Sequence, residues 1–317
     1  MSTSDPTPQT SAFILCPGQG SQHVGMGQAW FDQFPVARQT FAAADEALGI
    51  KLSELCFQGP DDELNRTDVA QAAIYTTSVA CYQALIEAEM IAPPAAVAGL
   101  SLGEFTALHL AGAMSFADGL KLVRLRGQAM QDAADAAPPS TMVALTGTAT
   151  EDHIQALCDR ALAACPDDAV LVPANYNSPM QTVLSGTTAA CEKAAELAPD
   201  AGVKATVLTV AGAFHSPIMQ PAADRLAAAL DQVDWSAPRC PVIANVTAKP
   251  HDADPESIKK LLVSQLTSPV RWSQSMLAAA ADHADLAFHE LAPGKVLAGL
   301  MRRIDKSIKV IPHPSPD

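Results

Sequence analysis

Two short apolar runs, each next to a glycine turn and followed by segments with helical spacing, constrain the fold of this chain most strongly. Residues 13–16 end at a Pro-Gly turn, and residues 95–100 lie between a Pro-Pro break and a glycine-bracketed turn. Wholly apolar runs of this length are typical of strands buried on both faces. Apolar positions recur with helical spacing in the segments 28–48, 68–90, 103–113 and 118–134. Strands that alternate with helices in this way predict an α/β fold with a parallel sheet.

A second order of elements begins after Pro138 and Pro139. The pattern predicts strands at 142–145, 170–173, 182–184 and 204–210, helices at 150–164 and 188–198, and a turn at Asn175–Met180. The resulting order, βαββαβ, is that of a ferredoxin-like unit. We therefore expect a small inserted subdomain at 140–209 within a larger α/β subdomain formed by 12–139 and 210–312. The larger subdomain is expected to resume with helices at 217–232, 255–265 and 272–282 and a strand at 242–246.

Composition excludes several classes of function. The formal net charge is −14, which disfavours nucleic acid as a partner because phosphate contacts require a basic surface. No apolar run reaches the ~18 residues of a membrane span, and the N-terminal residues do not have the pattern of a signal peptide. Seven scattered cysteines without a CxxC pair predict free thiols in a reducing cytosol rather than disulfides or a zinc site. We expect a cytoplasmic monomer without a bound metal or prosthetic group, and disordered tails at 1–11 and 313–317.

The segment 99–103 is a Gly-x-Ser-x-Gly motif set between a predicted strand and a predicted helix. In this context the sharp turn strains the backbone at Ser101, requires glycine close by, and leaves the hydroxyl exposed at the edge of the sheet. The helix N-terminus that follows favours negative charge, so an oxyanion can form there. The motif alone is common, and a glycine-bracketed turn with an incidental serine is the alternative. The strand–turn–helix context favours a nucleophile.

A serine nucleophile needs a base, and His215 is the best placed of the eight histidines. It follows the predicted strand 204–210, in a loop fixed by Gly212 and Pro217. A histidine in a loop can equally be a solvated polar residue. His289 is the rival candidate, because α/β-hydrolases place their histidine late in the chain, after an acidic residue.

Two further features are candidates for substrate contacts. The segment 17–22 is a glycine-bracketed turn after the first strand, which can direct a backbone N–H at an oxyanion or can be an ordinary turn. Arg124 and Arg126 lie about 200° apart on a predicted helix, so both cannot be solvated on one face. An inward-facing Arg126 needs an anion, such as a substrate carboxylate. The alternative is that both arginines lie at the margins of the helix surface.

Six segments, in their order along the chain, carry a resemblance to one family. They are GQGSQ, GLSLGE, RLRG, ANYNSP, GAFHS and QLTSPVRW. Together they closely resemble the malonyl-CoA:acyl carrier protein transacylases of type II fatty-acid synthesis, and also the acyltransferase domains of polyketide synthases. The resemblance extends from about residue 12 to residue 305. It implies an α/β-hydrolase-like domain with a ferredoxin-like insertion, in agreement with the element pattern.

The resemblance implies malonyl transfer through an acyl-serine intermediate, in support of fatty-acid or polyketide chain elongation. It makes Ser101 the acylated nucleophile and His215 its base. It places the backbone N–H groups of Gln19 and Leu102 in the oxyanion hole, and Gln265 would orient His215 through its backbone carbonyl. Coenzyme A would enter only as the substrate thioester, with no cofactor bound.

The same resemblance implies a set of substrate contacts. Arg126 would pair with the malonyl carboxylate, while Asn175 and Asn177 would belong to a loop of the small subdomain that faces the cleft. Phe214 stands where family members that select malonyl commonly have Phe. Leu100 is a departure, because many relatives have His immediately before the nucleophile. That position is not the family's base, so the catalytic expectation is unchanged.

Two other classes of function are compatible with parts of the sequence. A serine thioesterase could use the same turn around Ser101, but such hydrolases add an acidic residue to serine and histidine. Arg126 also has an obvious role only if the acyl group carries a carboxylate. A carrier-protein-binding module without activity is opposed by the presence of Ser101, His215 and Arg126 together. Release of free acid without a carrier would favour the hydrolase, and absence of an acyl-enzyme would favour the binding module.

A basic stretch near the C-terminus contrasts with the acidic chain. The stretch 295–309 carries Lys295, Arg302, Arg303, Lys306 and Lys309. The simplest interpretation is a solvated helix face. The sharper one is a docking patch for an acyl carrier protein, because carrier proteins of this pathway are typically acidic. In a third interpretation, docking falls to Lys204 or other basic residues near the subdomain cleft.

Overall fold

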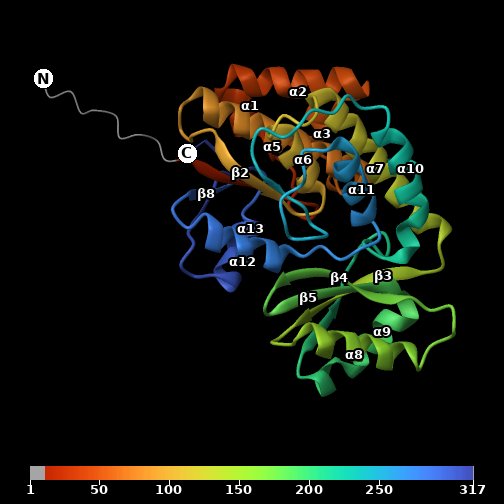
Figure 1. Cartoon of the computed structure of the whole chain (residues 1–317). Helices are drawn as coiled ribbons and strands as arrows, with labels where there is room; N and C mark the ends of the chain where they lie inside the picture. The colour runs from red at the N-terminus through yellow and green to blue at the C-terminus, as the bar shows by residue number, and fades with distance from the viewer. Residues whose placement is uncertain (1–10, 317) are drawn as a thin grey trace, which may run out of the picture.

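Residues 11–316 are described by a computed structural model of the chain, and their strands form two separate sheets (Figure 1). The first sheet consists of β1 (Ala12–Cys16), β2 (Pro94–Gly99), β7 (Val242–Ile243), β8 (Ala287–Glu290) and β9 (Val310–Pro312). Their spatial order is β7-β2-β1-β8-β9, and every neighbouring pair is parallel. The predicted α/β fold with a parallel sheet is therefore confirmed. The predicted tail 1–11 lies outside the described residues except for Ser11.

Side chains of the central strand β1 alternate between two hydrophobic cores. Ile14 and Cys16 belong to the larger core, and Phe13 and Leu15 belong to the smaller core on the other face of the sheet. The helices that pack on the larger core include α5 (Thr67–Glu87), α6 (Leu102–Leu110) and α7 (Phe116–Ala136), and those on the smaller core are α12 (Trp272–Asp282) and α13 (Val296–Ile304). Because both faces are covered, every residue of β1 is buried and the strand is wholly apolar.

The second sheet belongs to a small subdomain at the bottom of Figure 1. Its elements in chain order are β3 (Ser140–Thr146), α8 (Glu151–Leu162), β4 (Leu171–Ser178), β5 (Gln181–Thr187), α9 (Thr188–Leu197) and β6 (Lys204–Val207). The strands are antiparallel in the order β4-β5-β3-β6, so the predicted ferredoxin-like arrangement is observed. Val143 and Leu145 pack under α8 and α9, whereas Met142 and Ala144 face the core of the larger subdomain. The predicted boundaries of 140–209 stay a prediction.

The remaining helices complete the larger subdomain, except for one turn in the small one. They are α1 (Gln28–Gln33), α2 (Pro35–Leu48), α3 (Leu52–Gln58), α4 (Asp61–Leu64), α10 (Gln220–Leu230), α11 (Pro255–Gln265), and the 3-10 turns η1 (Ala198–Ala201) and η2 (Pro217–Met219). The helix expected at 28–48 is divided, because Pro35 starts α2 and forces Phe34 before it into an extended conformation. None of the described helices combines the length and the apolar character needed to cross a membrane.

One expected turn and one expected strand differ in the structure. The turn expected at Asn175–Met180 is mostly strand, because β4 continues to Ser178. Tyr176 N donates a 2.9 Å hydrogen bond to Val270 O, which gives this extension a partner in the larger subdomain. The strand expected at 242–246 ends at Ile243, because the chain turns there toward the site described below.

The C-terminal part of the first sheet was not expected from the sequence. Strands β8 and β9 are only four and three residues long and lack a strong alternating pattern. His313, placed in the predicted tail 313–317, instead donates its N–H to Glu290 O at 2.9 Å and stacks on His289. This segment is therefore bound to the edge of the sheet.

Candidate active site

Ser101 lies on a sharp turn between the end of β2 and the start of α6. Its backbone has φ 54° and ψ −104°, a strained conformation for a residue other than glycine. The flanking glycines allow the turn, because a Cβ on Gly99 would come 1.9 Å from Gly103 C, and a Cβ on Gly103 would come 2.1 Å from Cys16 O. Asn245 holds the turn from the side, since its Oδ1 accepts a 2.6 Å hydrogen bond from Ser101 N. The turn places the serine at the carboxyl end of the parallel sheet.

His215 lies directly against the Ser101 hydroxyl. Its Nε2 is 2.8 Å from Ser101 Oγ, and its Nδ1 is 2.7 Å from the backbone oxygen of Gln265. Because a carbonyl only accepts hydrogen bonds, Nδ1 carries the proton and Nε2 presents its lone pair to the serine. Burial, followed by the Arg126 cation, lowers the pKa of His215 to about 4, against the opposing effect of the bond to Gln265. The imidazole is therefore neutral at neutral pH and able to accept a proton.

His289, the rival candidate base, lies in a different part of the sheet. It belongs to β8, and its Nδ1 is 2.9 Å from Nε2 of His313. Within residues 11–316, no hydrogen bond joins its ring to Ser101. The structure thus brings His215, and not His289, to the serine.

Arg126 is the arginine of α7 that turns inward. Its side chain is 1% exposed, and its Nη2 is 3.0 Å from Ser101 Oγ and 2.9 Å from Gln265 Oε1. Nη1 donates to Gln71 Oε1 at 2.7 Å, while Nε has no hydrogen-bond partner among the described residues. Burial lowers the pKa of Arg126 to about 10, and the Glu104 carboxylate opposes this shift. A charged guanidinium therefore lies beside the serine at neutral pH.

Arg124 points in another direction from the same helix. It forms a 3.0 Å ion pair with Asp68, and its side chain is partly exposed. The different surroundings of Arg124 and Arg126 follow from their angular separation on the helix. Of the two alternatives that the sequence left open, the structure has the one in which Arg126 turns inward.

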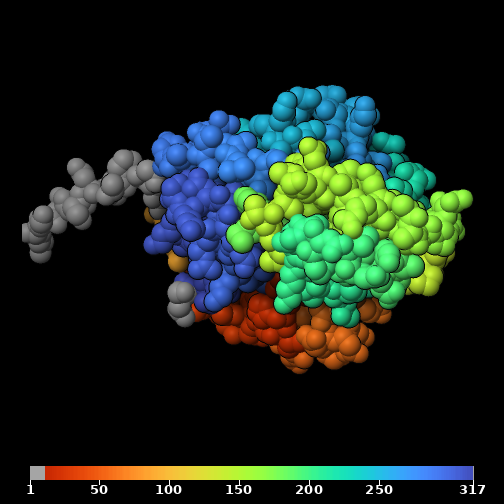
Figure 2. Space-filling model, turned by 90° about the horizontal axis from the view of Figure 1, so that it is seen from below, coloured from red at the N-terminus to blue at the C-terminus, as the bar shows by residue number. Residues whose placement is uncertain are grey.

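A cavity of about 630 Å³ opens onto Ser101 and His215 between the two subdomains. Phe214, Asn175 and Asn177, which the sequence proposed as substrate contacts or loop residues facing the cleft, all line it. Its lining also includes the apolar residues Met130, Met142, Val183, Leu208 and Val210. Figure 2 shows the face on which the small subdomain (yellow-green to green) meets the C-terminal segment in blue and the N-terminal segment in red. Within 11–316, no three histidine, cysteine or carboxylate side chains gather as ligands for a metal ion.

Two backbone N–H groups near the serine were predicted to hold an oxyanion. Gln19 lines the cavity on an exposed loop, which is ordered by a 2.7 Å hydrogen bond from Ser21 Oγ to Gly18 O and another of 2.7 Å from Gly20 N to Gln22 Oε1. Leu102 is the first residue of α6, where backbone N–H groups have no acceptor within the helix. The role of these two N–H groups in an oxyanion hole stays a prediction.

Three buried polar residues of the site were not identified from the sequence. They are Gln71, Glu104 and Asn245. Glu104 directly follows the Gly-x-Ser-x-Gly motif, and Gln71 lies between Ala70 and Ala72, so a polar residue among small or apolar neighbours was the available signal. Nothing comparable distinguishes Asn245, because it lies where a strand was expected to continue.

Comparison with known proteins identifies close relatives of the whole chain. Residues 13–313 match the family described as acyl transferase domain. A malonyl CoA-acyl carrier protein transacylase from Bacillus subtilis (strain 168) is 40% identical over 306 residues, covering 96% of this chain and 93% of the relative. A protein of the same name from Escherichia coli (strain K12) is 41% identical over 301 residues, covering 92% of each chain.

Solved structures of similar proteins have the same fold. The malonyl CoA-acyl carrier protein transacylase from Coxiella burnetii has a TM-score of 0.90 and 37% identity, and the match covers 97% of this chain and 95% of that one. A type II PKS acyl-carrier protein in complex with its malonyl-transacylase gives a TM-score of 0.89 with 35% identity, covering 96% of both chains.

Proposed function

The chain belongs to the acyl transferase domain family, and on that basis we propose that it transfers a malonyl group from coenzyme A to the phosphopantetheine thiol of an acyl carrier protein. Relatives 40% and 41% identical to it are malonyl CoA-acyl carrier protein transacylases. The observation that carries the proposal is the buried Arg126 cation, 3.0 Å from Ser101 Oγ. A fixed cation beside a nucleophile favours an acyl group that bears its own carboxylate. The transfer supplies fatty-acid or polyketide chain elongation.

The first half-reaction acylates Ser101. Its Oγ attacks the thioester carbonyl carbon while the hydroxyl proton passes to Nε2 of His215, 2.8 Å away. The carbonyl oxygen becomes an oxyanion, held by the N–H groups of Gln19 and Leu102. When the tetrahedral intermediate collapses, the C–S bond breaks and the coenzyme A sulfur leaves with the proton from His215. The malonyl-serine ester remains.

The second half-reaction is the reverse with a different thiol. The phosphopantetheine thiol of the carrier protein gives its proton to His215, and its sulfur attacks the ester carbonyl. The C–O bond to Ser101 then breaks, and the serine oxygen recovers the proton. Gln265 keeps the imidazole in one orientation throughout, because its backbone oxygen accepts the Nδ1 proton at 2.7 Å. The kinetics are therefore ping-pong.

The walls of the cavity give the acyl group its position. Arg126 lies 3.0 Å from Ser101 Oγ and pairs with the malonyl carboxylate; its Nε is left without a partner by residues 11–316. Phe214 lies next to His215 in the chain and limits the room beside the carboxylate, while Asn175 contributes a polar contact from the small subdomain. These three residues are the proposed substrate-binding set.

A serine thioesterase is less well supported than a transferase. The orienting group of His215 is a backbone carbonyl, whereas hydrolases with this turn use a carboxylate. Arg126 also has no role in releasing an acyl group that lacks a carboxylate. The relatives named above are transacylases, and none of these observations favours the hydrolase.

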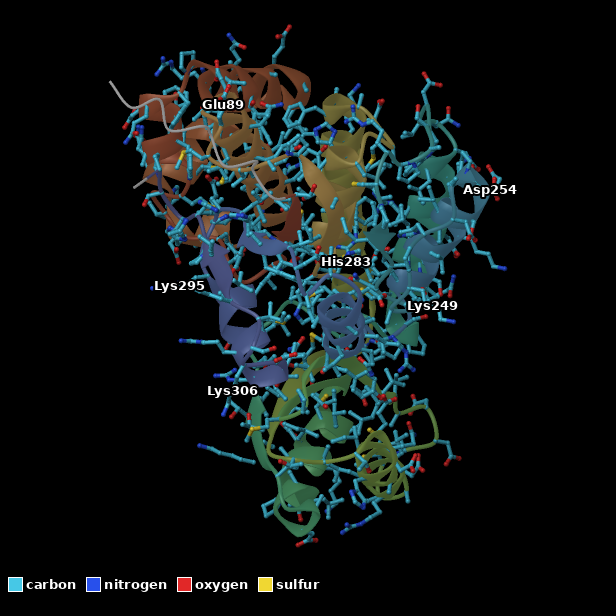
Figure 3. All side chains as sticks on the ribbon, turned by 60° about the vertical axis from the view of Figure 1, so that its left-hand side comes forward. Glu89, Lys249, Asp254, His283, Lys295 and Lys306 are labelled. Atoms are coloured by element: carbon cyan, nitrogen blue, oxygen red, sulfur yellow. The ribbon has the colours of Figure 1, made fainter. Side chains whose placement is uncertain are left out.

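The acyl carrier protein is proposed to dock on the basic patch formed by Lys295, Arg302, Arg303 and Lys306. All four side chains are exposed, and none of them is in an ion pair within residues 11–316. Figure 3 labels Lys295 and Lys306 near the two ends of α13, the helix that packs next to β4 of the small subdomain. A similar transacylase binds an acyl-carrier protein. A cytosolic monomer remains our prediction for the free enzyme.

Intact-mass analysis tests the proposed function directly. Incubation with malonyl-CoA should add one malonyl group, and later addition of a phosphopantetheinylated carrier protein should move that group to the carrier. Ser101→Ala should take up no malonyl group at all. Release of free malonate at the same rate with and without carrier would instead support a hydrolase.

A further inference from the structure

Glu104 is a buried carboxylate behind Ser101 that the proposed reaction does not use. It lies in the first turn of α6 and is 1% exposed. Its Oε2 accepts hydrogen bonds from Asn245 N at 3.1 Å and from Gln265 Nε2 at 2.7 Å. Its Oε1 is 2.6 Å from His251 Nε2. Burial of a carboxylate is costly, so a group with this many contacts next to a nucleophile points to a positioning role.

The partners of Gln265 determine which way its side-chain amide faces. Nε2 donates to Glu104 Oε2 at 2.7 Å and to the backbone oxygen of Ser101 at 3.0 Å. Both of these partners can only accept. Oε1 on the other side accepts from Arg126 Nη2 at 2.9 Å. If the amide were reversed, its oxygen would face the oxygens of Glu104 and Ser101, and its NH₂ group would face the Arg126 guanidinium. The observed orientation is therefore the one that gives every group a suitable partner.

Arg126 depends on that orientation for its place beside Ser101. Its hydrogen-bond partners are the neutral oxygens of Gln71, Gln265 and Ser101, and within residues 11–316 no carboxylate contacts it directly. The negative charge of Glu104 is therefore one amide away. A direct ion pair would occupy the guanidinium, whereas an intervening amide holds it and leaves it free for a substrate carboxylate.

We propose that Glu104 is a positioning residue for carboxylate recognition, which acts by fixing the Gln265 side-chain amide so that its oxygen holds Arg126 beside Ser101. The inference rests on the proposed malonyl transfer, because it assigns a purpose to the Arg126 cation. It separates two tasks of Gln265: the backbone oxygen orients His215, and the side chain orients Arg126.

His251 completes the arrangement by fixing the second oxygen of Glu104. Its side chain is fully buried, although Lys249 and Asp254, its neighbours on the loop, are exposed (Figure 3). With Oε1 held by His251, Oε2 of Glu104 remains aligned with Gln265. The loop between β7 and α11 thus contacts both carboxylate oxygens, through Asn245 N at Oε2 and His251 Nε2 at Oε1.

Two substitutions of Glu104 separate the effect of side-chain length from the effect of charge. Glu104→Gln keeps an oxygen for Gln265 Nε2 and Asn245 N, and its NH₂ can face His251, which can accept at Nε2 in its other tautomer. Glu104→Asp keeps the charge but withdraws the carboxylate from Gln265. The change that conserves charge should therefore be the harmful one, and the change that conserves shape should be tolerated.

The assay is the rate of Ser101 acylation by malonyl-CoA and by acetyl-CoA, with no carrier protein present. We expect Glu104→Asp to lower the malonyl-to-acetyl ratio of kcat/KM by about tenfold or more, which is the effect of losing one hydrogen bond to a charged group, and Glu104→Gln to keep the ratio within about threefold. Gln265→Met should resemble Glu104→Asp, because the backbone oxygen to His215 is retained. The double variant should be no worse than either single one.

Glu290→Gln is the matched control, since this carboxylate is also fully buried but holds the N-terminus of α13 through Leu297 N and Ala298 N. It should lower the melting temperature and leave the malonyl-to-acetyl ratio unchanged. Equal loss on both acyl groups in Glu104→Asp, a loss in Glu104→Gln as large as in Glu104→Asp, or multiplicative effects in the double variant would each overturn the inference. Failure of the unmodified protein to accept malonyl at all would instead refute the proposed function.

Discussion

Replacing Arg126 by alanine should change which acyl group is accepted more than how fast the serine reacts. The substitution removes a guanidinium that lies 3.0 Å from Ser101 Oγ and is 1% exposed. A malonyl carboxylate would then enter the site without a partner, at a cost of about 2–5 kcal/mol. The cavity of about 630 Å³ admits water, which favours the lower half of that range. We expect the malonyl-to-acetyl ratio of kcat/KM to fall by about 100-fold.

Stopped-flow measurement of coenzyme A release gives that ratio for malonyl-CoA and acetyl-CoA separately. Arg126→Lys should restore it only in part, because an ammonium cannot reproduce the planar fork. Arg124→Ala is the control, since Arg124 lies on the same helix but pairs with Asp68, which keeps a second partner in Arg66 at 3.2 Å. An equal fall in rate for both thioesters in Arg126→Ala would show that the residue is structural, and the selection argument would fail.

Three more predictions concern the base, its protonation and the docking patch. His215→Ala should abolish acylation of Ser101 while His289→Ala stays active, as measured by intact mass; the opposite result would move the base. Because burial and Arg126 lower the pKa of His215 to about 4, acylation should stay level as the pH falls below 6.5 and decline only near pH 4. The free energy of unfolding should decrease as the pH falls from 6.5 to about 4, because the histidine of the unfolded chain keeps its ordinary pKa and takes up the proton first. A rate profile centred on pH 6.5 would contradict the lowered pKa. Reversing charge at the adjacent arginines 302 and 303 should raise KM for the carrier at low salt and leave acylation by malonyl-CoA unchanged, and an unchanged KM would eliminate the patch.

The elements that could be predicted from the sequence are those with strong local signals. Strand β1 is wholly apolar and ends at a turn, and the segment around Ser101 combines a glycine motif with a strand before it and a helix after it. Short strands such as β8 and β9 carry no such signal, because their stability comes from neighbours in the sheet. The continuation of β4 to Ser178 pairs with the neighbouring β5, and Val270, which is far away in the sequence, adds a hydrogen bond at Tyr176 that the sequence does not reveal.

The site shows the same division between local and distant information. Helix geometry shows that Arg124 and Arg126 cannot share one face, but it left open whether either of them turns inward. The contacts that hold Arg126 could not be anticipated, because Gln71 and Gln265 are 55 and 139 residues away. The role of Asn245 is equally non-local, since its side chain bonds Ser101 N from 144 residues away. Side-chain networks of this kind are specified only once the chain has folded.

The cavity is lined by residues from both subdomains, and only the larger one carries the proposed reacting residues. Ser101, His215 and Arg126 all come from the segments of the larger subdomain, whereas Asn175 and Met142 reach the cavity from the smaller one. The small sheet is therefore a wall that can be reshaped without touching the reacting atoms. Substitutions in the small sheet, at positions such as Met142 and Val183, would therefore change the shape of the cavity while Ser101, His215 and Arg126 keep their places.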